Sequence, residues 1–241
     1  MKTILKKLLK KLLRLLGYRL IKIRPPSRPS PFGKKDLDSL KALNESKGVL
    51  HLGAHRGTEA EVYNWFGKKV IWFEAVPYIY DQLKENIQVY SNQKCFCALL
   101  GDEDGTKKNF YISNNDSASS SLFSFSKNTL SGKYFSNRVL KMKKNISLSM
   151  KKLDTILEDQ NISVSEYDHW IIDLQGAELL ALKGSENSLQ YCKSMSVEVS
   201  TVDIYDGGVM WEELRLWLEK KNFYPNTKPD KNHTDVLFIK K

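Results

Sequence analysis

Short apolar runs alternate with longer amphipathic stretches along most of the chain. The runs have the length and the β-branched or aromatic content of strands, and the stretches between them repeat apolar residues at helical spacing. The predicted strands are residues 48–52, 70–73, 94–100, 109–112, 146–150, 170–174, 195–199 and 236–239. The predicted helices are residues 58–66, 78–89, 153–159, 177–191 and 208–222. This alternation predicts an α/β fold with a mostly parallel sheet covered by helices on both faces.

The N-terminal residues follow a different pattern. In ILKKLLKKLLRLL, residues 4–16, an α-helix would place the leucines on one side and five cations on the other. Gly17 is a natural stop for such a helix, and the proline-rich residues 24–33 predict a stiff linker. We therefore divide the chain into residues 1–35, an amphipathic helix with its linker, and residues 36–241, a folded α/β domain.

No run of residues is apolar for long enough to cross a bilayer, and no small-residue cleavage site follows the leucine-rich segment. Residues 4–16 instead predict a helix that lies in the plane of an anionic membrane. Packing of this helix on the body, or binding of nucleic acid through charge alone, are the alternatives. Three cysteines do not make a disulfide framework, and Cys95-x-Cys97 lacks the second ligand pair of a structural zinc site, so we expect a cytoplasmic protein, peripheral at the membrane surface.

The net charge of +10 is distributed unevenly. Residues 1–35 contain 12 lysines and arginines and no acidic residue, whereas residues 36–241 contain 26 basic and 28 acidic residues, a net charge of −2. A body with this charge lacks the excess of basic residues that is typical of a protein that binds a phosphate backbone. A local basic patch is still compatible with this net charge. We therefore expect no nucleic-acid partner.

Two glycines follow the first predicted strand, in the sequence HLGAHRG that begins at His51. Glycines at such a turn let the backbone approach a ligand and free the amides at the helix start. Glu74 ends the second strand, 21 residues after Gly53, where an acid typically accepts hydrogen bonds from a ribose diol. A dinucleotide fold would have a second glycine at the position of His55, so the pattern favours a nucleoside without a pyrophosphate, such as S-adenosylmethionine. An ordinary strand–helix turn is the alternative.

A second group of polar residues lies in IIDLQGAELLALKGSE, residues 171–186. With HLGAHRG, WFEAVP, ALLGDEDG and MSVEVS, in this order, it makes the chain resemble the FkbM family of S-adenosylmethionine-dependent methyltransferases over residues 48–241. The resemblance implies a Rossmann-like class I methyltransferase fold, with a mostly parallel seven-stranded sheet whose last strand is antiparallel. It also implies methyl transfer to hydroxyl oxygens of sugars, polyketides and related metabolites.

The resemblance implies a role for individual residues. The residues that it implies for cofactor binding are His51, Gly53, Ala54, His55, Gly57, Glu74, Ala98 and Leu99. Asp173 and Glu178 match the family's Asp-x-x-Gly-x-Glu pattern, Glu198 matches the acid of the fifth strand, and these three are the predicted catalytic residues.

The chain departs from the family pattern at two places. His51 stands where the family usually has an aspartate, which commonly helps to hold the amino-acid end of the cofactor. After Asp173, Leu174-Gln175 replaces the usual Val or Ile followed by Glu, and this removes one carboxylate beside the site.

The predicted chemistry is modest, because a sulfonium methyl group is already activated. The protein must hold a hydroxyl oxygen about 3 Å from that methyl group and accept the hydroxyl proton. Asp173 is the first candidate and Glu198 the second. The alternative roles are structural, since a strand-end aspartate often caps the next helix and Glu178 can fix the turn. A divalent metal between the carboxylates is a further alternative, but no histidine-rich set supports it, so no metal is predicted.

Residues 113–131 are rich in serine and asparagine and predict a loop longer than a compact domain usually has without a purpose. Its hydroxyl and amide groups suit a polar acceptor such as a sugar, and Ser119, Ser120 and Ser121 are the predicted acceptor-binding residues. A merely flexible surface loop is the alternative.

Three other functions compete with O-methyl transfer to a glycan or related polar metabolite. An NAD-dependent oxidoreductase is disfavoured because the second glycine of its fingerprint is absent. A non-catalytic, membrane-attached binding module is suggested by His51. An RNA 2′-O-methyltransferase is disfavoured by the charge of the body.

Overall fold

The computed structural model describes residues 34–134 and 139–241. Residues 34–241 form one compact unit. The predicted amphipathic helix of residues 4–16 and its linker lie outside the described residues. In the described part of the chain, every helix is too short or too polar to span a bilayer.

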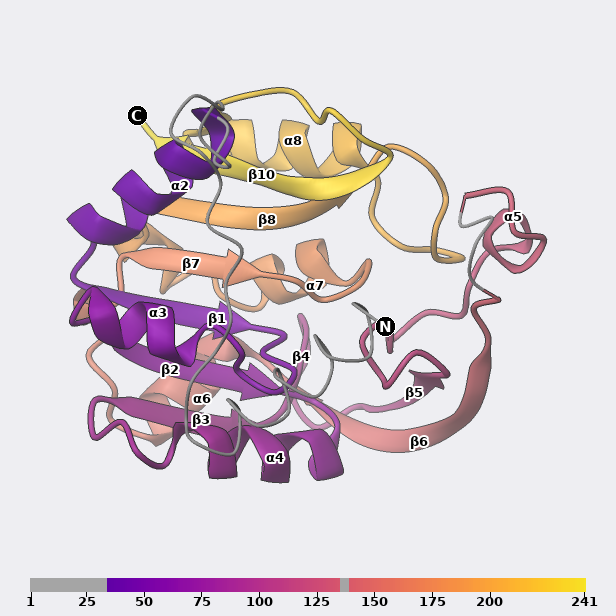
Figure 1. Cartoon of the computed structure of the whole chain (residues 1–241), viewed down its shortest axis with the longest axis horizontal. Coiled ribbons are helices and arrows are strands. Elements are labelled where there is room, and N and C mark those ends of the chain that lie inside the picture. Colours follow the sequence, from indigo (N-terminus) through magenta and orange to yellow (C-terminus); the bar gives the residue numbers. More distant parts are fainter. Residues whose placement is uncertain (1–33, 135–138) are drawn as a thin grey trace, which may run out of the picture. The chain divides into compact units, whose positions relative to one another are not determined.

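The central sheet has seven strands in the order β3-β2-β1-β7-β8-β10-β9. Its strands are β1 (Gly48–Leu52), β2 (Lys69–Glu74), β3 (Gln93–Cys97), β7 (His169–Ile172), β8 (Ser194–Ser200), β9 (Phe223–Pro225) and β10 (His233–Lys240). The first five in spatial order run parallel, and β10 is antiparallel to both of its neighbours. The predicted seven-stranded Rossmann-like fold with an antiparallel last strand is thus confirmed (Figure 1).

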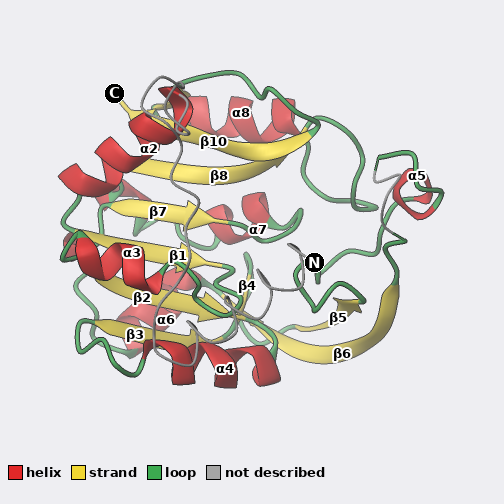
Figure 2. Ribbon diagram, in the orientation of Figure 1, coloured by secondary structure: helices red, strands yellow, loops and turns green. Residues whose placement is uncertain are grey.

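Helices cover both faces of this sheet (Figure 2). They are α2 (Lys34–Glu45), α3 (Ala60–Trp65), α4 (Pro77–Ile87), α6 (Leu153–Asp159), α7 (Glu178–Lys183) and α8 (Trp211–Lys220). Successive strand residues point to opposite faces, so Val49 and Val70 pack with α2, α3 and α4, whereas Leu50 and Ile71 pack with α6, α7 and α8. This double burial explains the nearly continuous apolar runs of the parallel strands.

A second, three-stranded sheet lies beyond the carboxyl ends of the parallel strands (Figure 1). It is formed by β4 (Leu99–Leu100), β5 (Lys107–Ser113) and β6 (Met142–Lys151) in the order β4-β6-β5. The connection from β5 to β6 contains the short helix α5 (Lys127–Leu130), inside the segment predicted as a loop. This sheet is the element that brings the serine-rich segment to the edge where a ligand would bind.

Several predicted elements differ in detail from the observed ones. The predicted strand 94–100 is interrupted at Ala98, because the chain leaves β2 there to pair with β6. The predicted helix 177–191 ends at Lys183, and a Cβ on the following Gly184 would lie 1.9 Å from the Gly101 carbonyl oxygen. Helix α2 and strand β9 were not predicted.

Candidate functional site

The loop after β1 is fastened to the end of β2 through its backbone. The N–H groups of Gly53 and Ala54 donate to the carbonyl oxygen of Phe73 at 3.0 and 2.9 Å. The N–H of His55 donates to Glu74 Oε2 at 2.8 Å. Since these three amides are satisfied within the protein, the loop offers a ligand its shape and side chains rather than a row of free N–H groups.

The two glycines of this loop are crowded by the protein itself. Gly53 has φ +88°, and a Cβ there would lie 1.8 Å from the carbonyl oxygen of Asp173. Gly57 has φ +65°, and its Cβ would meet the Leu83 side chain at 2.6 Å. Gly53 therefore lets the turn after β1 touch the turn after β7, and this contact brings the predicted cofactor loop and Asp173 together.

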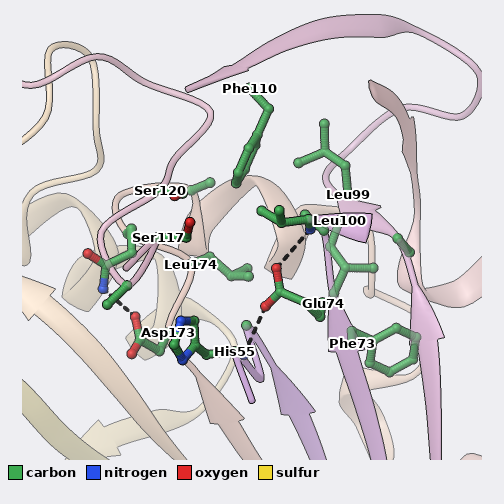
Figure 3. A pocket seen from close by; sticks show the side chains of 17 residues that line it. His55, Phe73, Glu74, Leu99, Leu100, Phe110, Ser117, Ser120, Asp173 and Leu174 are labelled. Carbon is green, nitrogen blue, oxygen red and sulfur yellow. Dashed lines mark hydrogen bonds between the residues drawn. The ribbon is translucent and has the colours of Figure 1, made fainter. Parts of the chain in front are cut away.

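Glu74 lies in the middle of a pocket at this edge of the sheet (Figure 3). Its Oε1 accepts the N–H of Val76 at 2.8 Å, and Oε2 accepts the N–H of His55. Burial raises the pKa of Glu74 to about 7, and the two N–H donors oppose the rise. A carboxylate has about four acceptor positions, so both oxygens retain capacity for the hydroxyls of a ribose.

Apolar side chains form the wall of the pocket on one side of Glu74, and Asp173 lies on the other (Figure 3). The apolar lining residues are Phe73, Val76, Ala98, Leu99, Leu100 and Phe110. An apolar slot beside a carboxylate is what an adenine base and its ribose require. The residues present therefore fit the nucleoside of S-adenosylmethionine, with Ala98 and Leu99 at the base and Glu74 at the ribose.

The serine-rich segment is clasped to the loop after β1 across the mouth of this pocket. Arg56 makes a bidentate ion pair with Asp116, at 2.6 and 2.8 Å, and His55 Nε2 lies 3.0 Å from the Asp116 carbonyl oxygen. The Ser117 and Tyr78 hydroxyls are 2.5 Å apart. Of the clasped segment, Ser117, Ala118 and Ser120 line the pocket.

Asp116→Asn should release this clasp while keeping a residue that tolerates the observed φ of +62°. We expect S-adenosylmethionine to dissociate about two- to fivefold faster, the size expected for an exposed ion pair. Stopped-flow displacement would measure the rate. Glu166→Gln, which removes the exposed ion pair with Lys69 at 2.9 Å, is the matched control and should leave the rate unchanged. Equal rates for wild type and Asp116→Asn would contradict a closing role.

Three side chains join the ends of β7 and β8 beside this pocket. Asp173 directly follows β7, and Gln175 Nε2 donates to its Oδ1 at 2.5 Å. The same amide nitrogen donates to Glu198 Oε2, and the hydroxyl of Tyr205 donates to Gln175 Oε1. Because both polar atoms of the amide are used, Gln175 holds the two predicted catalytic carboxylates at a set spacing.

A histidine extends this network on the far side of Glu198. His233 Nε2 lies 2.9 Å from Glu198 Oε1, and His233 Nδ1 lies 2.8 Å from the Ser200 hydroxyl. The pair is partly exposed, with 21% of the His233 side chain and 15% of the Glu198 side chain accessible. A proton on Glu198 therefore has a path through the imidazole toward solvent.

The carboxylates of this network hold protons more tightly than ordinary ones. Burial raises the pKa of Glu198 to about 8, and burial together with the charge of Glu198 raises the pKa of Asp173 well above its usual range. Burial lowers the pKa of His233. A carboxylate that titrates near neutrality suits a group that must accept a proton during a reaction.

Glu178 has a different environment. Its Oε1 accepts the N–H groups of Leu174 and Gly176, both at 3.0 Å, and the residue is 2% exposed. Burial raises its pKa to about 7. These contacts hold the turn that carries Asp173 and Gln175, which is the structural alternative considered for this residue.

Some predicted site residues lie away from the pocket lining. His51 is buried, with Nδ1 3.0 Å from the Tyr63 hydroxyl and its ring stacked on Trp72 at 4.7 Å, so the expected direct contact with the cofactor does not follow from its position. Ala54 packs in the same core cluster as Tyr63 and Trp72. Gly57 faces Leu83.

The three predicted acceptor-binding serines lie on the same edge as Asp173. Ser120 lines the pocket, the Ser121 hydroxyl donates to the Gln175 carbonyl oxygen at 2.7 Å, and the Ser119 carbonyl oxygen accepts the Tyr205 hydroxyl at 3.3 Å. The hydroxyls of all three serines are already hydrogen-bonded to the protein, that of Ser119 as acceptor of the Asn115 side-chain amide at 2.9 Å, and Ser119 is the most exposed of the three.

Gln175, Tyr205, His233, Arg56 and Asp116 were not predicted as site residues. Gln175 was considered only as the loss of a carboxylate. Arg56 lies within HLGAHRG and Asp116 within the serine-rich segment, but neither was given a role, and no motif contained Tyr205 or His233. Among the described residues, no three histidine, cysteine or carboxylate groups are arranged to hold a metal ion.

The model of the FkbM methyltransferase domain matches residues 51–225. No curated protein matches the chain. Similar solved structures include TrmK of M. capricolum with S-adenosylhomocysteine (9% identity, 87% of this chain and 69% of that chain, TM-score 0.44). A TehB-like methyltransferase of Corynebacterium glutamicum (10%, 96% and 94%, 0.43) and the magnesium protoporphyrin IX methyltransferase of Synechocystis (10%, 98% and 97%, 0.42) are also similar.

Proposed function

The chain belongs to the FkbM methyltransferase family and uses S-adenosylmethionine as its cofactor, and from this premise we propose that it methylates a hydroxyl oxygen of a sugar, a glycan or a related polar metabolite. The observation that carries the proposal is the network of Asp173, Gln175 and Glu198 beside the pocket that contains Glu74. Paired carboxylates at this place can accept hydrogen bonds from neighbouring sugar hydroxyls and take a proton from one of them.

S-adenosylmethionine, when bound, supplies a methyl group that is already activated by its sulfonium. Asp173 lines the cofactor pocket and is partly exposed, so an acceptor hydroxyl in the pocket can reach its carboxylate. In the proposed reaction Asp173 would orient this hydroxyl and take its proton as the oxygen–carbon bond forms and the methyl–sulfur bond breaks, with S-adenosylhomocysteine as the leaving group. Glu198 and His233 share the proton and pass it toward solvent, while Gln175 and Glu178 keep the carboxylates and the turn in place.

The polar character of the surrounding loop supports a polar acceptor. Ser117 lines the pocket, and Asn115 and Ser119 flank it in the same loop. Their hydroxyl and amide groups bond to one another and to Tyr78, so a polar acceptor would exchange with these hydrogen bonds. Such groups recognise sugar hydroxyls through hydrogen bonds rather than charge.

The direct test is transfer of a labelled methyl group from S-adenosylmethionine to a glycan and glycolipid fraction. A methyl ether survives mild base, whereas a methyl ester is released as methanol, so base treatment distinguishes an alcohol acceptor from a carboxylate acceptor. Base-stable label in the carbohydrate supports the proposal. Label in RNA, or in base-labile form, would overturn it. Tight cofactor binding without transfer to any fraction would favour a binding module.

We also propose that residues 4–16 attach the protein peripherally to an anionic membrane. Each cation near an anionic leaflet contributes about 1 kcal/mol, and the leucine side adds burial. Changing Leu8, Leu12 and Leu15 together to Ser keeps every positive charge. We expect this variant to lose most liposome co-sedimentation at physiological salt, because charge alone does not need an apolar side. Unchanged co-sedimentation, or none for the wild type, would refute membrane attachment by this helix.

A further inference from the structure

The segment that closes the site is strongly basic. Residues 117–153 contain eight lysines and arginines and no aspartate or glutamate. The rest of residues 36–241 contains 18 basic and 28 acidic residues. The nearly neutral body is therefore polarised, with an excess of positive charge on the connection between β5 and β6 and on β6 itself.

Five lysines of this connection and of the first residues of β6 are exposed, and we call them the basic arm: Lys127, Lys133, Lys141, Lys143 and Lys144. Within residues 34–134 and 139–241, no ion pair joins any of the five to a carboxylate. The charges of Lys143 and Lys133 help to lower the pKa of Asp116 and of Asp203, but neither lysine is within ion-pair distance, so the five charges remain available to a partner.

Two apolar side chains are exposed among these lysines. Leu130, in α5, is 55% exposed, and Val139 is 73% exposed. A hydrated polyanion gives such side chains nothing to pack against. A lipid surface accepts both, because cations meet the headgroups while apolar side chains enter the acyl boundary.

The basic arm is attached directly to the acceptor side of the site. The N–H of Ser126 and the hydroxyl of Thr129 donate to the carbonyl oxygen of Ile204, at 3.0 and 2.9 Å. Phe125 stacks on Tyr205 with ring centroids 5.3 Å apart, and Tyr205 donates to Gln175. A partner held by the arm is therefore held next to Asp173 and Glu198.

The spacing of the charges indicates a surface rather than a small ligand. The five lysines are spread from α5 to the start of β6, and none of them lines the cofactor pocket. Recognition of a single phosphate usually relies on convergent groups such as the fork of an arginine. Dispersed lysines with exposed apolar neighbours match an anionic leaflet instead.

We propose that the basic arm docks on an anionic lipid surface and presents the acceptor side of the site to molecules held in that surface. This contact is separate from the one predicted for residues 4–16. It deepens the proposed function, because it makes the acceptor class a lipid-linked or membrane-displayed glycan, but the contact itself does not require that methyl transfer to sugars be correct.

The test uses full-length protein with Leu8, Leu12 and Leu15 changed to Ser, so that the N-terminal leucines do not contribute. Vesicles of phosphatidylglycerol with phosphatidylcholine are compared with vesicles of phosphatidylcholine alone in co-sedimentation at physiological salt. Lys127→Glu, Lys133→Glu and Lys141→Glu are combined, leaving Lys143 and Lys144 beside the clasp. The matched control combines Lys94→Glu, Lys183→Glu and Lys220→Glu, three exposed lysines outside the arm.

We expect the arm variant to bind the anionic vesicles at least a hundredfold more weakly, since each lysine contributes about fivefold. The control should change binding much less. Leu130→Ser with Val139→Ser, which keeps all charges, should also weaken vesicle binding. The affinity for S-adenosylmethionine should stay unchanged in every variant, which shows that the fold is intact.

Equal losses in the arm variant and the control, or no binding to anionic vesicles, would overturn the proposal. So would an arm variant that loses binding to single-stranded RNA while vesicle binding is unaffected, which would identify nucleic acid as the partner. If docking is lost as expected but no sugar is methylated, the docking proposal stands and the proposed function fails.

Discussion

Replacing Glu74 with alanine should weaken S-adenosylmethionine binding by about ten- to a hundredfold. The carboxylate lies in the middle of the pocket, and a hydrogen bond to a charged group contributes about 1.5–3 kcal/mol. Isothermal titration calorimetry of the wild type and the variant measures the difference. The adenine wall of Leu99, Leu100 and Phe110 stays in place in this variant, so residual binding is expected.

The same carboxylate should make cofactor binding depend on pH. Ribose hydroxyls donate to the ionised form of Glu74, and burial raises its pKa to about 7. Binding therefore favours loss of the proton. The affinity should be constant above this pKa and should fall as the pH drops below it, by up to about tenfold per unit. Glu74→Gln should bind weakly at every pH and lose this dependence.

The control for Glu74 is a carboxylate that also accepts a backbone N–H but lies elsewhere. Asp104 accepts the N–H of Lys152 at 2.9 Å and the Thr155 hydroxyl at 2.8 Å, and it does not line the pocket. Asp104→Asn should leave the affinity unchanged. Binding that is indifferent to Glu74, or a Glu74→Gln variant with the wild-type pH dependence, would contradict the assignment of Glu74 to the ribose.

The architecture could be predicted from the sequence because buried strands and helices have recognisable patterns of apolar residues. Strands such as β1 and β7 are buried on both faces, so nearly every residue is apolar and the strands are visible without a structure. Helix α2 has no such clear pattern of apolar residues. It packs on β10, which is far away in the sequence, and only a short apolar stripe including Leu43 is buried.

The cofactor side of the site was predictable for a related reason. In a parallel sheet the carboxyl ends of neighbouring strands lie at one edge. Glu74 at the end of β2 and Asp173 after β7 were therefore expected close to the loop after β1. His51 shows the limit of this reasoning. Its position directly before the loop suggested cofactor binding, but alternation along β1 turns its side chain into the core beside Trp72.

The acceptor side of the site depends on long-range contacts that have no signature in the neighbouring sequence. Gln175 became a bridge only because Tyr205, from the β8–α8 connection, orients its amide. His233 is brought to Glu198 by the antiparallel register of β10 on β8, in which Asp235 lies opposite Glu198. Pairings of this kind join residues more than 25 positions apart, and nothing in the neighbouring sequence indicates them.

Asp173→Asn should lower the rate of methyl transfer by about a hundred- to ten-thousandfold, the usual contribution of a positioned acid or base. Asparagine keeps the size of the side chain and its contact with Gln175, so the affinity for S-adenosylmethionine should change little. Single-turnover transfer of labelled methyl measures the rate, and calorimetry measures the affinity. A variant that retains more than about a tenth of wild-type transfer would show that Asp173 is not the base.

Gln175→Glu should move the pH dependence of methyl transfer instead of abolishing the reaction. The change replaces the two N–H donors to Asp173 and Glu198 with a third carboxylate and restores the residue that is usual in the family. Like charges disfavour ionisation, so the pKa of the accepting carboxylate should rise. The base must be ionised to take a proton, and the acidic limb of the rate profile should therefore move to higher pH, by about one unit or more.

Tyr205→Phe removes the hydroxyl that orients the amide without adding charge, and it should lower the rate while leaving the midpoint of the profile in place. Coincident profiles for Gln175→Glu and the wild type would mean that the amide does not control the ionisation of the carboxylates.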